Sequence, residues 1–338
     1  MATGKVARRT VVSDVADLLN SPEVSALYEK LDALGDPRGR KGYGARALLG
    51  ACLVKSLFNL PTWTWVAALI AEHPGLQDAL GGSPSMWAMY RFSKKLRANY
   101  PALNACVDAC AASLRAQYPD FGRDVAIDAS DLPAYANGQR YVSNGGKERE
   151  RFSDPDASWG HRSAVSTRSA GSFYGHKLHM AVCTATGLPL AWRVETAKRQ
   201  ESLYLAPLLD ALHVRGFRPE TVAADKGYDN ARVYAECEER GIEPVIPLRG
   251  ARKQTMMPLA LGGRLFPRIP RHTQRFKDLY RGRAAVERAF GDLKHGYGLA
   301  PLRVRGLERV QLHADLTILA RLAQALSRAR SVAVAVAA

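Results

Sequence analysis

The spacing of apolar residues divides the chain into a helical first part and a second part that mixes strands with helices. From Ser13 to about Tyr118, apolar residues such as Leu27 and Leu31 recur at helical spacing, which predicts a series of amphipathic helices. From Asp124 onward, short apolar runs and alternating segments predict strands separated by further helices. We therefore expect an all-α region followed by an α/β domain.

Two of the expected strands deliver a carboxylate. The strand Val125–Ser130 carries Asp128 near its end, and the strand Thr221–Ala224 is followed directly by Asp225. Between them, two alternating segments joined at residues 186–187 predict a β-hairpin. Open α/β sheets carry their sites beyond the carboxyl ends of their strands, so both carboxylates are candidates, although a lone Asp there is also a common turn former.

Two long segments lack a regular pattern. Residues 134–171 are polar, and we expect a long, mobile excursion there. Residues 249–283 are irregular and rich in Arg and Lys with Asp278 as the one acid, which predicts a track for a phosphate backbone. An amphipathic helix is expected over Leu307–Arg330, with residues 331–338 as a frayed tail.

One helix of the first part has a basic face. With Ser83 or Ser85 as its cap, the helix Met86–Leu96 carries Arg91 and Lys94 on one side, together with Lys95, and apolar residues on the other. Such a helix can lie in a major groove of DNA. A solvated basic face is the equally simple alternative.

The charge of the whole chain favours a polyanionic partner. The 338 residues are 47% hydrophobic and 24% charged, as in ordinary globular proteins, but Lys and Arg total 48 against 32 Asp and Glu. A net charge of +16 indicates nucleic acid first and an anionic membrane surface second.

Cysteine content and hydropathy argue against several other classes. The five cysteines are scattered without a CxxC pair, so neither a zinc knuckle nor a disulfide framework is indicated. No apolar run approaches about 18 residues, the length a membrane span requires. We expect a cytoplasmic protein with reduced thiols and no membrane association.

The segment YRGRAAVERAFGDLK, residues 280–294, combines four polar side chains in one pattern. On an ideal helix Tyr280, Arg283, Glu287 and Lys294 fall within an arc of about 60°. The opposite arc is apolar and consists of Ala285, Val286, Ala289, Phe290 and Leu293. Two cations and a phenol beside a carboxylate suit a phosphodiester held near a metal ion. A solvated face with an i, i+4 salt bridge is the alternative.

Three carboxylates on three elements suggest metal-ion chemistry. Bringing Asp128, Asp225 and Glu287 together would be costly unless divalent cations shared their charge. Two hard cations held about 3.5–4 Å apart by carboxylate oxygens are a known arrangement for in-line attack on a phosphodiester. Asp131 and Asp229 are near alternatives to the first two residues.

These residues resemble a known family, the DDE transposases of bacterial insertion sequences. Within it, the chain is similar to the large group with a Tyr-Arg-Glu-Lys signature, whose spacing matches Tyr280, Arg283, Glu287 and Lys294. The stretches AIDAS, YGHKLH, TGLPLAWRV and ADKGYDN are also similar to that group. The resemblance covers about residues 124–326. Some relatives insert a large β-rich domain before the Glu, and residues 229–286 leave no room for one.

The resemblance implies a fold, a reaction and a role for each residue. The fold is α/β, a ribonuclease H-like mixed sheet flanked by helices and preceded by an all-α N-terminal domain. Asp128, Asp225 and Glu287 would be the catalytic metal ligands for two Mg²⁺ or Mn²⁺ ions. The contacts to the DNA end would be Tyr280, Arg283 and Lys294.

The same resemblance implies partners, location and boundaries. The partner would be double-stranded DNA, both terminal inverted repeats and target, bound by a homodimer in the bacterial cytoplasm and associated with the nucleoid when on DNA. A DNA-binding or accessory domain is expected over residues 1–120 and a catalytic domain over residues 121–330. The alternatives are a catalytically inactive DNA-binding regulator and a general ribonuclease H-like nuclease.

Overall fold

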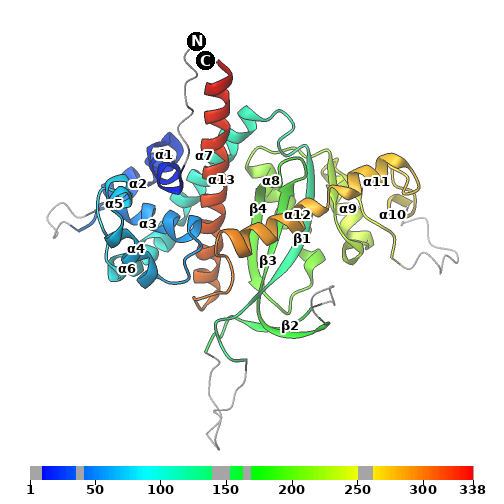
Figure 1. The fold of residues 1–338 in the computed structure, drawn as a ribbon. Coiled ribbons are helices and arrows are strands. Elements are labelled where there is room, and N and C mark those ends of the chain that lie inside the picture. The colour runs from blue at the N-terminus through cyan, green and yellow to red at the C-terminus, as the bar shows by residue number, and fades with distance from the viewer. Residues whose placement is uncertain (1–9, 36–41, 139–152, 163–168, 250–261, 338) are drawn as a thin grey trace, which may run out of the picture. The chain divides into compact units, whose positions relative to one another are not determined.

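The computed structural model describes residues 10–35, 42–138, 153–162, 169–249 and 262–337 (Figure 1). The chain forms two compact units. The first comprises residues 1–114, 293–299 and 312–338, and the second residues 115–292 and 300–311. Both ends of the chain therefore contribute to the first unit. The expected functional boundaries at residues 120 and 330 stay a prediction.

The first unit is helical, as the apolar spacing predicts. Its helices are α1 (Val11–Asn20), α2 (Pro22–Ala33), α3 (Ala45–Leu57), α4 (Trp63–Glu72), α5 (Pro74–Leu80), α6 (Met86–Ala98), most of α7 (Tyr100–Gln117) and the greater part of α13 (Leu307–Ala337). Ser85 caps α6 by accepting a hydrogen bond from the N–H of Ala88. Polar contacts tie α13 to the first helices, because Gln324 donates to Asp14 at 2.7 Å and Arg330 pairs with Glu23 at 2.6 Å.

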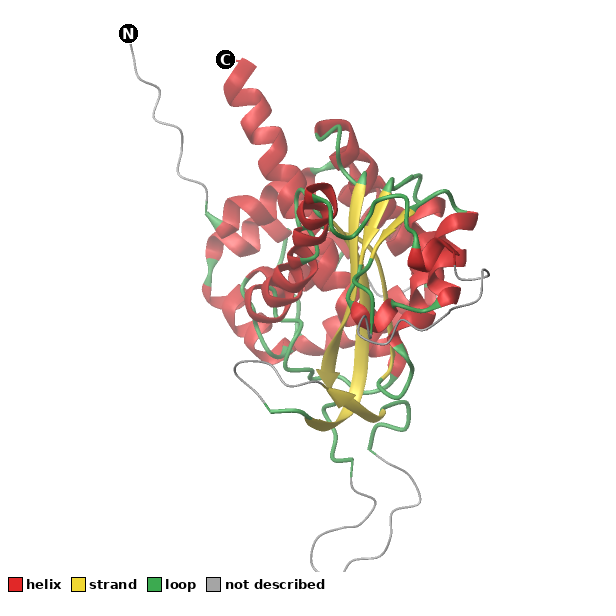
Figure 2. Ribbon diagram, turned by 90° about the vertical axis from the view of Figure 1, so that its right-hand side faces the viewer, coloured by secondary structure: helices red, strands yellow, loops and turns green. Residues whose placement is uncertain are grey.

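The second unit contains a mixed sheet whose long strands run side by side in Figure 2. Its strands are β1 (Asp124–Pro133), β2 (Ser158–Arg162), β3 (Gly171–Cys183), β4 (Pro189–Thr196), β5 (Thr221–Ala223) and β6 (Glu243–Val245). The order is β2-β3-β1-β5-β6, with β4 also paired to β3. The pairs β1–β3, β2–β3 and β3–β4 are antiparallel, while β1–β5 and β5–β6 are parallel.

Helices pack against this sheet from several directions. They are η1 (Glu201–Tyr204), α8 (Leu205–Val214), η2 (Lys226–Tyr228), α9 (Ala231–Glu239), α10 (Gly262–Leu265), α11 (Gln274–Arg281) and α12 (Ala284–Gly291). Helix α12 contacts β1 and β3 and crosses the strands in Figure 1, whereas α8 contacts β3 and β4. Both α9 and α11 contact β6. The expected α/β fold, a mixed sheet flanked by helices after an all-α region, is confirmed.

Some expectations about irregular segments were wrong. Strand β2 lies within residues 134–171 and pairs with β3, since long-range strand pairing orders a segment that its own sequence leaves polar. Helix α11 lies within residues 249–283 because Thr273 caps it and Phe276 is buried beneath it. Helix α13 continues to Ala337, so the helix does not end at residue 331. Residues 139–152, 163–168 and 250–261 lie outside the described part.

The described part of the chain contains neither a membrane-spanning helix nor a disulfide bond. None of its helices is long and apolar enough to cross a membrane. All five cysteines are free and buried.

Candidate functional site

Asp128 and Asp225 lie on neighbouring strands of the second unit. Strand β1 runs parallel to β5 only over Asp124–Ala126, and Asp225 follows directly where β5 ends. Asp128 is not at the end of its strand as expected, because β1 continues to Pro133 in antiparallel pairing with β3. Asp128 therefore lies just beyond the parallel pairing, at the same edge of the sheet as Asp225.

Local hydrogen bonds orient both carboxylates. The Oδ1 of Asp128 accepts the backbone N–H of Ala129 at 2.8 Å. The Oδ1 of Asp225 accepts the N–H of Gly227 at 2.8 Å, so Asp225 caps the short helix η2. The second oxygen of each carboxylate is left for other contacts.

Arg283 forms ion pairs with both Glu287 and Asp128 and so links the two carboxylates. The guanidinium of Arg283 contacts Asp128 Oδ2 at 3.3 Å with one terminal nitrogen and Glu287 Oε1 at 2.6 Å with the other. The side chain of Arg283 is 20% exposed and that of Glu287 56% exposed. One cation thus stands between two of the three predicted metal ligands.

Burial disfavours the charged form of Asp128. The pKa of Asp128 is raised to about 7, mainly by burial and to a smaller extent by the negative charges of Asp225 and Glu201. The N–H of Ala129 and the charge of Arg283 act in the opposite direction and lower it. Near neutral pH this carboxyl is therefore poised between its two protonation states, and additional positive charge nearby would favour the ionised form.

Tyr280 adjoins Arg283, but the expected single helix is divided. Helix α11 ends at Arg281, a turn at residues 282–283 follows, and α12 begins at Ala284. The division has a packing reason, because α11 contacts β6 whereas α12 lies against β1 and β3. The guanidinium of Arg283 nevertheless lies 5.9 Å from the centre of the Tyr280 ring, which in turn stacks on Phe276.

Lys294 is separated from the other signature residues by a change of helix type. It lies in a π-helical turn, η4 (Asp292–Gly296), which follows α12 directly. The wider turn changes the 3.6-residue periodicity on which the expected common stripe depended. Lys294 also belongs to the first compact unit, and its contact with DNA stays a prediction.

The alternatives Asp131 and Asp229 are disfavoured by the structure. Asp131 is three residues from Asp128 on β1, so it lies on the opposite face of the strand. Asp229 is buried and accepts two hydrogen bonds of 2.7 Å from Arg264 and one of 2.6 Å from the N–H of Arg249. Burial alone would raise the pKa of Asp229, but these bonds outweigh it and hold the pKa below its ordinary value. Asp229 is a structural anchor.

Sequence reasoning missed several groups near the carboxylates. Glu201, at the start of η1, pairs with the largely buried Lys177 at 2.5 Å. The hydroxyl of Tyr228 is buried and has no hydrogen-bond partner among the described residues. Burial raises the pKa of Tyr228 well above its usual value, and Asp128, Glu201 and Asp225 add to that effect. Only the three-residue distance between Asp225 and Tyr228 could have drawn attention to this phenol in the sequence.

The donor set suits a hard divalent cation without forming a complete binding cluster. Among the described residues, no three His, Cys, Asp or Glu side chains are grouped closely enough to hold a metal ion. Carboxylate oxygens are the ligands that Mg²⁺ and Mn²⁺ prefer, and Asp128 and Asp225 are close enough for the charge of Asp225 to raise the pKa of Asp128. The chemistry of the residues therefore fits, while Arg283 occupies the region between Asp128 and Glu287.

The basic segment 249–283 divides into cations that serve the fold and cations that face solvent. Arg264 binds Asp229, and Arg271 donates to the Ile246 carbonyl at 2.9 Å and to Tyr234 at 2.6 Å. The expectation that the whole run tracks a phosphate backbone is therefore too broad. The exposed members in the described part are Arg249, Arg268, Arg275, Lys277 and Arg281, and residues 252 and 253 lie outside it.

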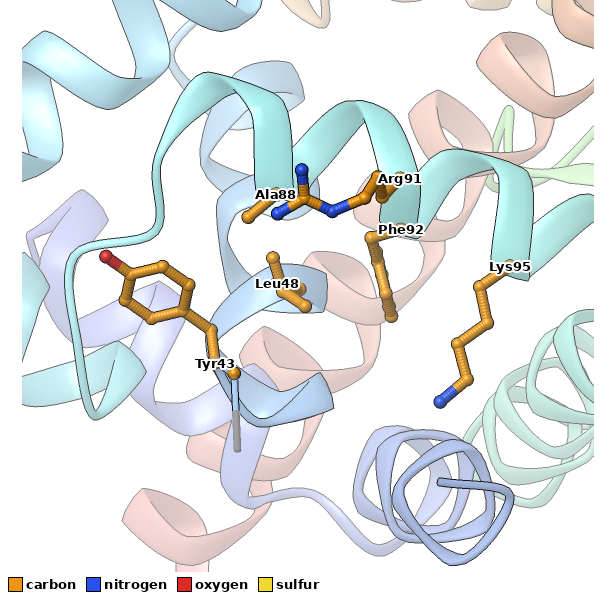
Figure 3. A pocket seen from close by; sticks show the side chains of 7 residues that line it. Tyr43, Leu48, Ala88, Arg91, Phe92 and Lys95 are labelled. Atoms are coloured by element: carbon orange, nitrogen blue, oxygen red, sulfur yellow. The ribbon is translucent and has the colours of Figure 1, made fainter. Parts of the chain in front are cut away.

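In the first unit, the exposed face of α6 differs in part from the expected one. Trp87, Tyr90, Arg91 and Lys94 are exposed at spacings of three and four residues, which forms one stripe. Lys95 instead donates to the Leu31 carbonyl at 2.6 Å. Beside the stripe is a pocket of about 750 Å³ lined by Gly42, Tyr43, Leu48, Ala88, Arg91, Phe92 and Lys95 (Figure 3).

Comparison with known proteins identifies a similarity that covers most of the second unit. Residues 119–323 match the family model described as "Transposase DDE domain". Over 108 residues the chain is 36% identical to a curated protein of Burkholderia cepacia named "Putative transposase for insertion sequence element IS402". The matched segment is 30% of this chain and 51% of that protein, so the chain spans about half the length of this relative.

Proposed function

This chain belongs to the transposase DDE domain family, and on that premise we propose that it cuts DNA at the ends of an insertion sequence and joins them to a target. The observation that best supports the proposal is the approach of Asp128 and Glu287 to one guanidinium, with Asp225 close enough to Asp128 for its charge to raise the pKa of Asp128. These carboxylates come from a strand, a strand end and a helix that are far apart in the sequence. Their convergence in one unit is what a catalytic site requires.

We propose that Asp128, Asp225 and Glu287 hold two Mg²⁺ or Mn²⁺ ions. When bound, such ions activate the attacking water or 3′-hydroxyl and stabilise the leaving oxygen. The chain itself would supply oxygen ligands in fixed orientations, since backbone N–H groups hold one oxygen of Asp128 and one of Asp225. Glu287, on the exposed side of α12, would complete the set.

The remaining signature residues would hold the DNA end. Arg283 can present two parallel N–H groups to a phosphate, a stronger and more directional contact than a point charge gives. Tyr280, fixed by its stacking on Phe276, would add a phenol hydrogen bond, and Lys294 a second positive charge. The exposed cations of α11 would continue this contact along the backbone.

The helical unit would provide a second DNA contact through α6. The exposed stripe combines two cations with two aromatic rings, and the ring centres of Trp87 and Tyr90 lie 5.9 Å apart. Cations suit phosphates, and aromatic rings suit sugars and bases. We propose that this unit recognises the terminal repeats, that the protein acts as a homodimer on DNA, and that it works in the bacterial cytoplasm in association with the nucleoid.

Incubation with labelled duplexes separates this proposal from its alternatives. The protein, Mg²⁺ and a duplex from the end of its own element should give cleavage at the junction, and an Asp225→Asn variant should give none. Binding without nicking would favour an inactive regulator. Cleavage indifferent to the end sequence would favour a general nuclease.

A further inference from the structure

Arg283 forms ion pairs with two of the three carboxylates that the proposed function assigns to metal ions. Its two terminal nitrogens contact Asp128 Oδ2 and Glu287 Oε1, one oxygen of each proposed ligand. The Asp128 side chain is only 18% exposed, so a charge there gains little from water. The guanidinium therefore supplies positive charge to both carboxylates at once.

A divalent ion and this guanidinium would compete for the same oxygens. An ion held by both Asp128 and Glu287 would lie close to Arg283, which now contacts one oxygen of each carboxylate, and two cations so close together would repel each other. Arg283 contacts both carboxylates from a single turn, so one movement of its side chain would release both. Metal binding at this pair would therefore be weak as long as Arg283 stays in place.

A DNA phosphate is a suitable alternative partner for Arg283. The residue lies in the turn between α11 and α12, and a rotation of its side chain would break its bonds to Asp128 and Glu287 but no backbone hydrogen bond of either helix. Three exposed cations of α11, Arg275, Lys277 and Arg281, would bring a phosphate backbone to this turn. A phosphate can accept both guanidinium N–H groups in the bidentate arrangement that carboxylates offer separately here.

We propose that Arg283 is a placeholder cation which keeps the metal site closed until a DNA end draws it away. This inference rests on the proposed function, because it takes Asp128 and Glu287 as metal ligands. DNA and metal then bind cooperatively, each increasing the affinity for the other by the same factor. The protein would thereby avoid assembling a nuclease centre on its own.

Mn²⁺ binding, followed by calorimetry or by the electron spin resonance signal of the free ion, tests the coupling without any cleavage. Wild-type protein without DNA should bind Mn²⁺ weakly, and Arg283→Ala should bind it at least about tenfold more tightly, a difference of about 1.4 kcal/mol. Addition of an element-end duplex should strengthen Mn²⁺ binding to the wild type by a similar factor and change Arg283→Ala little. Arg283→Gln, closer in size, should behave like Arg283→Ala.

Two controls separate this mechanism from general electrostatics and from failure of the site itself. Arg288→Ala removes an exposed charge from α12, the helix that follows Arg283, and its Mn²⁺ affinity should match that of the wild type. Asp128→Asn should abolish the Mn²⁺ binding that DNA promotes. If that binding persists in wild type and depends on Asp128, but Arg283→Ala gains no affinity, the placeholder role is overturned and the proposed function stands. If no Mn²⁺ binding depends on Asp128, both are overturned.

Discussion

Replacing Glu287 by glutamine removes one negative charge from the site at little structural cost. The Glu287 side chain is 56% exposed, and its pair with Arg283 spans a single helical turn. Exposed i, i+4 pairs contribute about 0.3–0.5 kcal/mol, so the free energy of unfolding should fall by no more than that. For a protein of this size, the midpoint of thermal unfolding should shift by about 1–2 °C at most.

The effect on cleavage should be far larger than the effect on folding. An amide is an uncharged and poorer ligand for a hard cation, so the ion that Glu287 would hold is lost or misplaced. Bound ions contribute several kcal/mol to the stabilisation of charge in such transition states. A loss of about 4 kcal/mol corresponds to cleavage about a thousandfold slower. DNA affinity should stay equal or rise slightly, because Arg283 is released from one of its two partners.

Single-turnover cleavage of a labelled element end, measured beside DNA binding and thermal unfolding, checks this prediction. Asp278→Asn is a matched control, since Asp278 is an exposed acid on α11 that pairs with Arg281 at 2.8 Å outside the site. The control should cleave at the wild-type rate. If Glu287→Gln, folded and bound to DNA, cleaves with Mg²⁺ as fast as the control, Glu287 is no metal ligand and the assignment of the site is wrong.

Three further predictions concern buried groups and surface charge. Tyr228→Phe removes a buried hydroxyl that has no hydrogen-bond partner in the described part of the chain, so urea unfolding should show equal or greater stability, by up to about 1 kcal/mol; a clear loss would mean that the hydroxyl is bonded. Asp229→Asn should destabilise the protein by about 3 kcal/mol near neutral pH, since Arg264 is left without its charged partner. The pKa of Asp229 is lower in the folded than in the unfolded protein. Its contribution to the free energy of unfolding is therefore complete above the unfolded pKa of about 3.9 and is lost as pH falls through the folded pKa. An Asp229→Asn effect that stays constant through that range would contradict this. DNA affinity should fall steeply with salt, with a slope of log K against log salt of about −5 or steeper, and a slope near −1 would exclude an extensive phosphate contact.

The sequence determined most of the local structure because local structure depends on neighbouring residues. Ser85, one of the two caps expected before the helix Met86–Leu96, caps α6. The two strand segments on either side of residues 186–187 pair as the expected hairpin. The signature residues and the net charge likewise indicated the family, since both are properties of the residues themselves.

The tertiary structure decided which groups share charge, because partners distant in the sequence leave no periodic signal. Arg283 and Asp128 are 155 residues apart, yet they meet because α12 packs on β1. The expected single helix is divided between α11, which contacts β6, and α12, which contacts β1 and β3. Three-dimensional contacts likewise turned Arg264 and Lys95 from surface cations into anchors of the fold. The sequence therefore determined which chemical groups are available, and the packing determined that Arg283 now holds the carboxylates expected to bind metal.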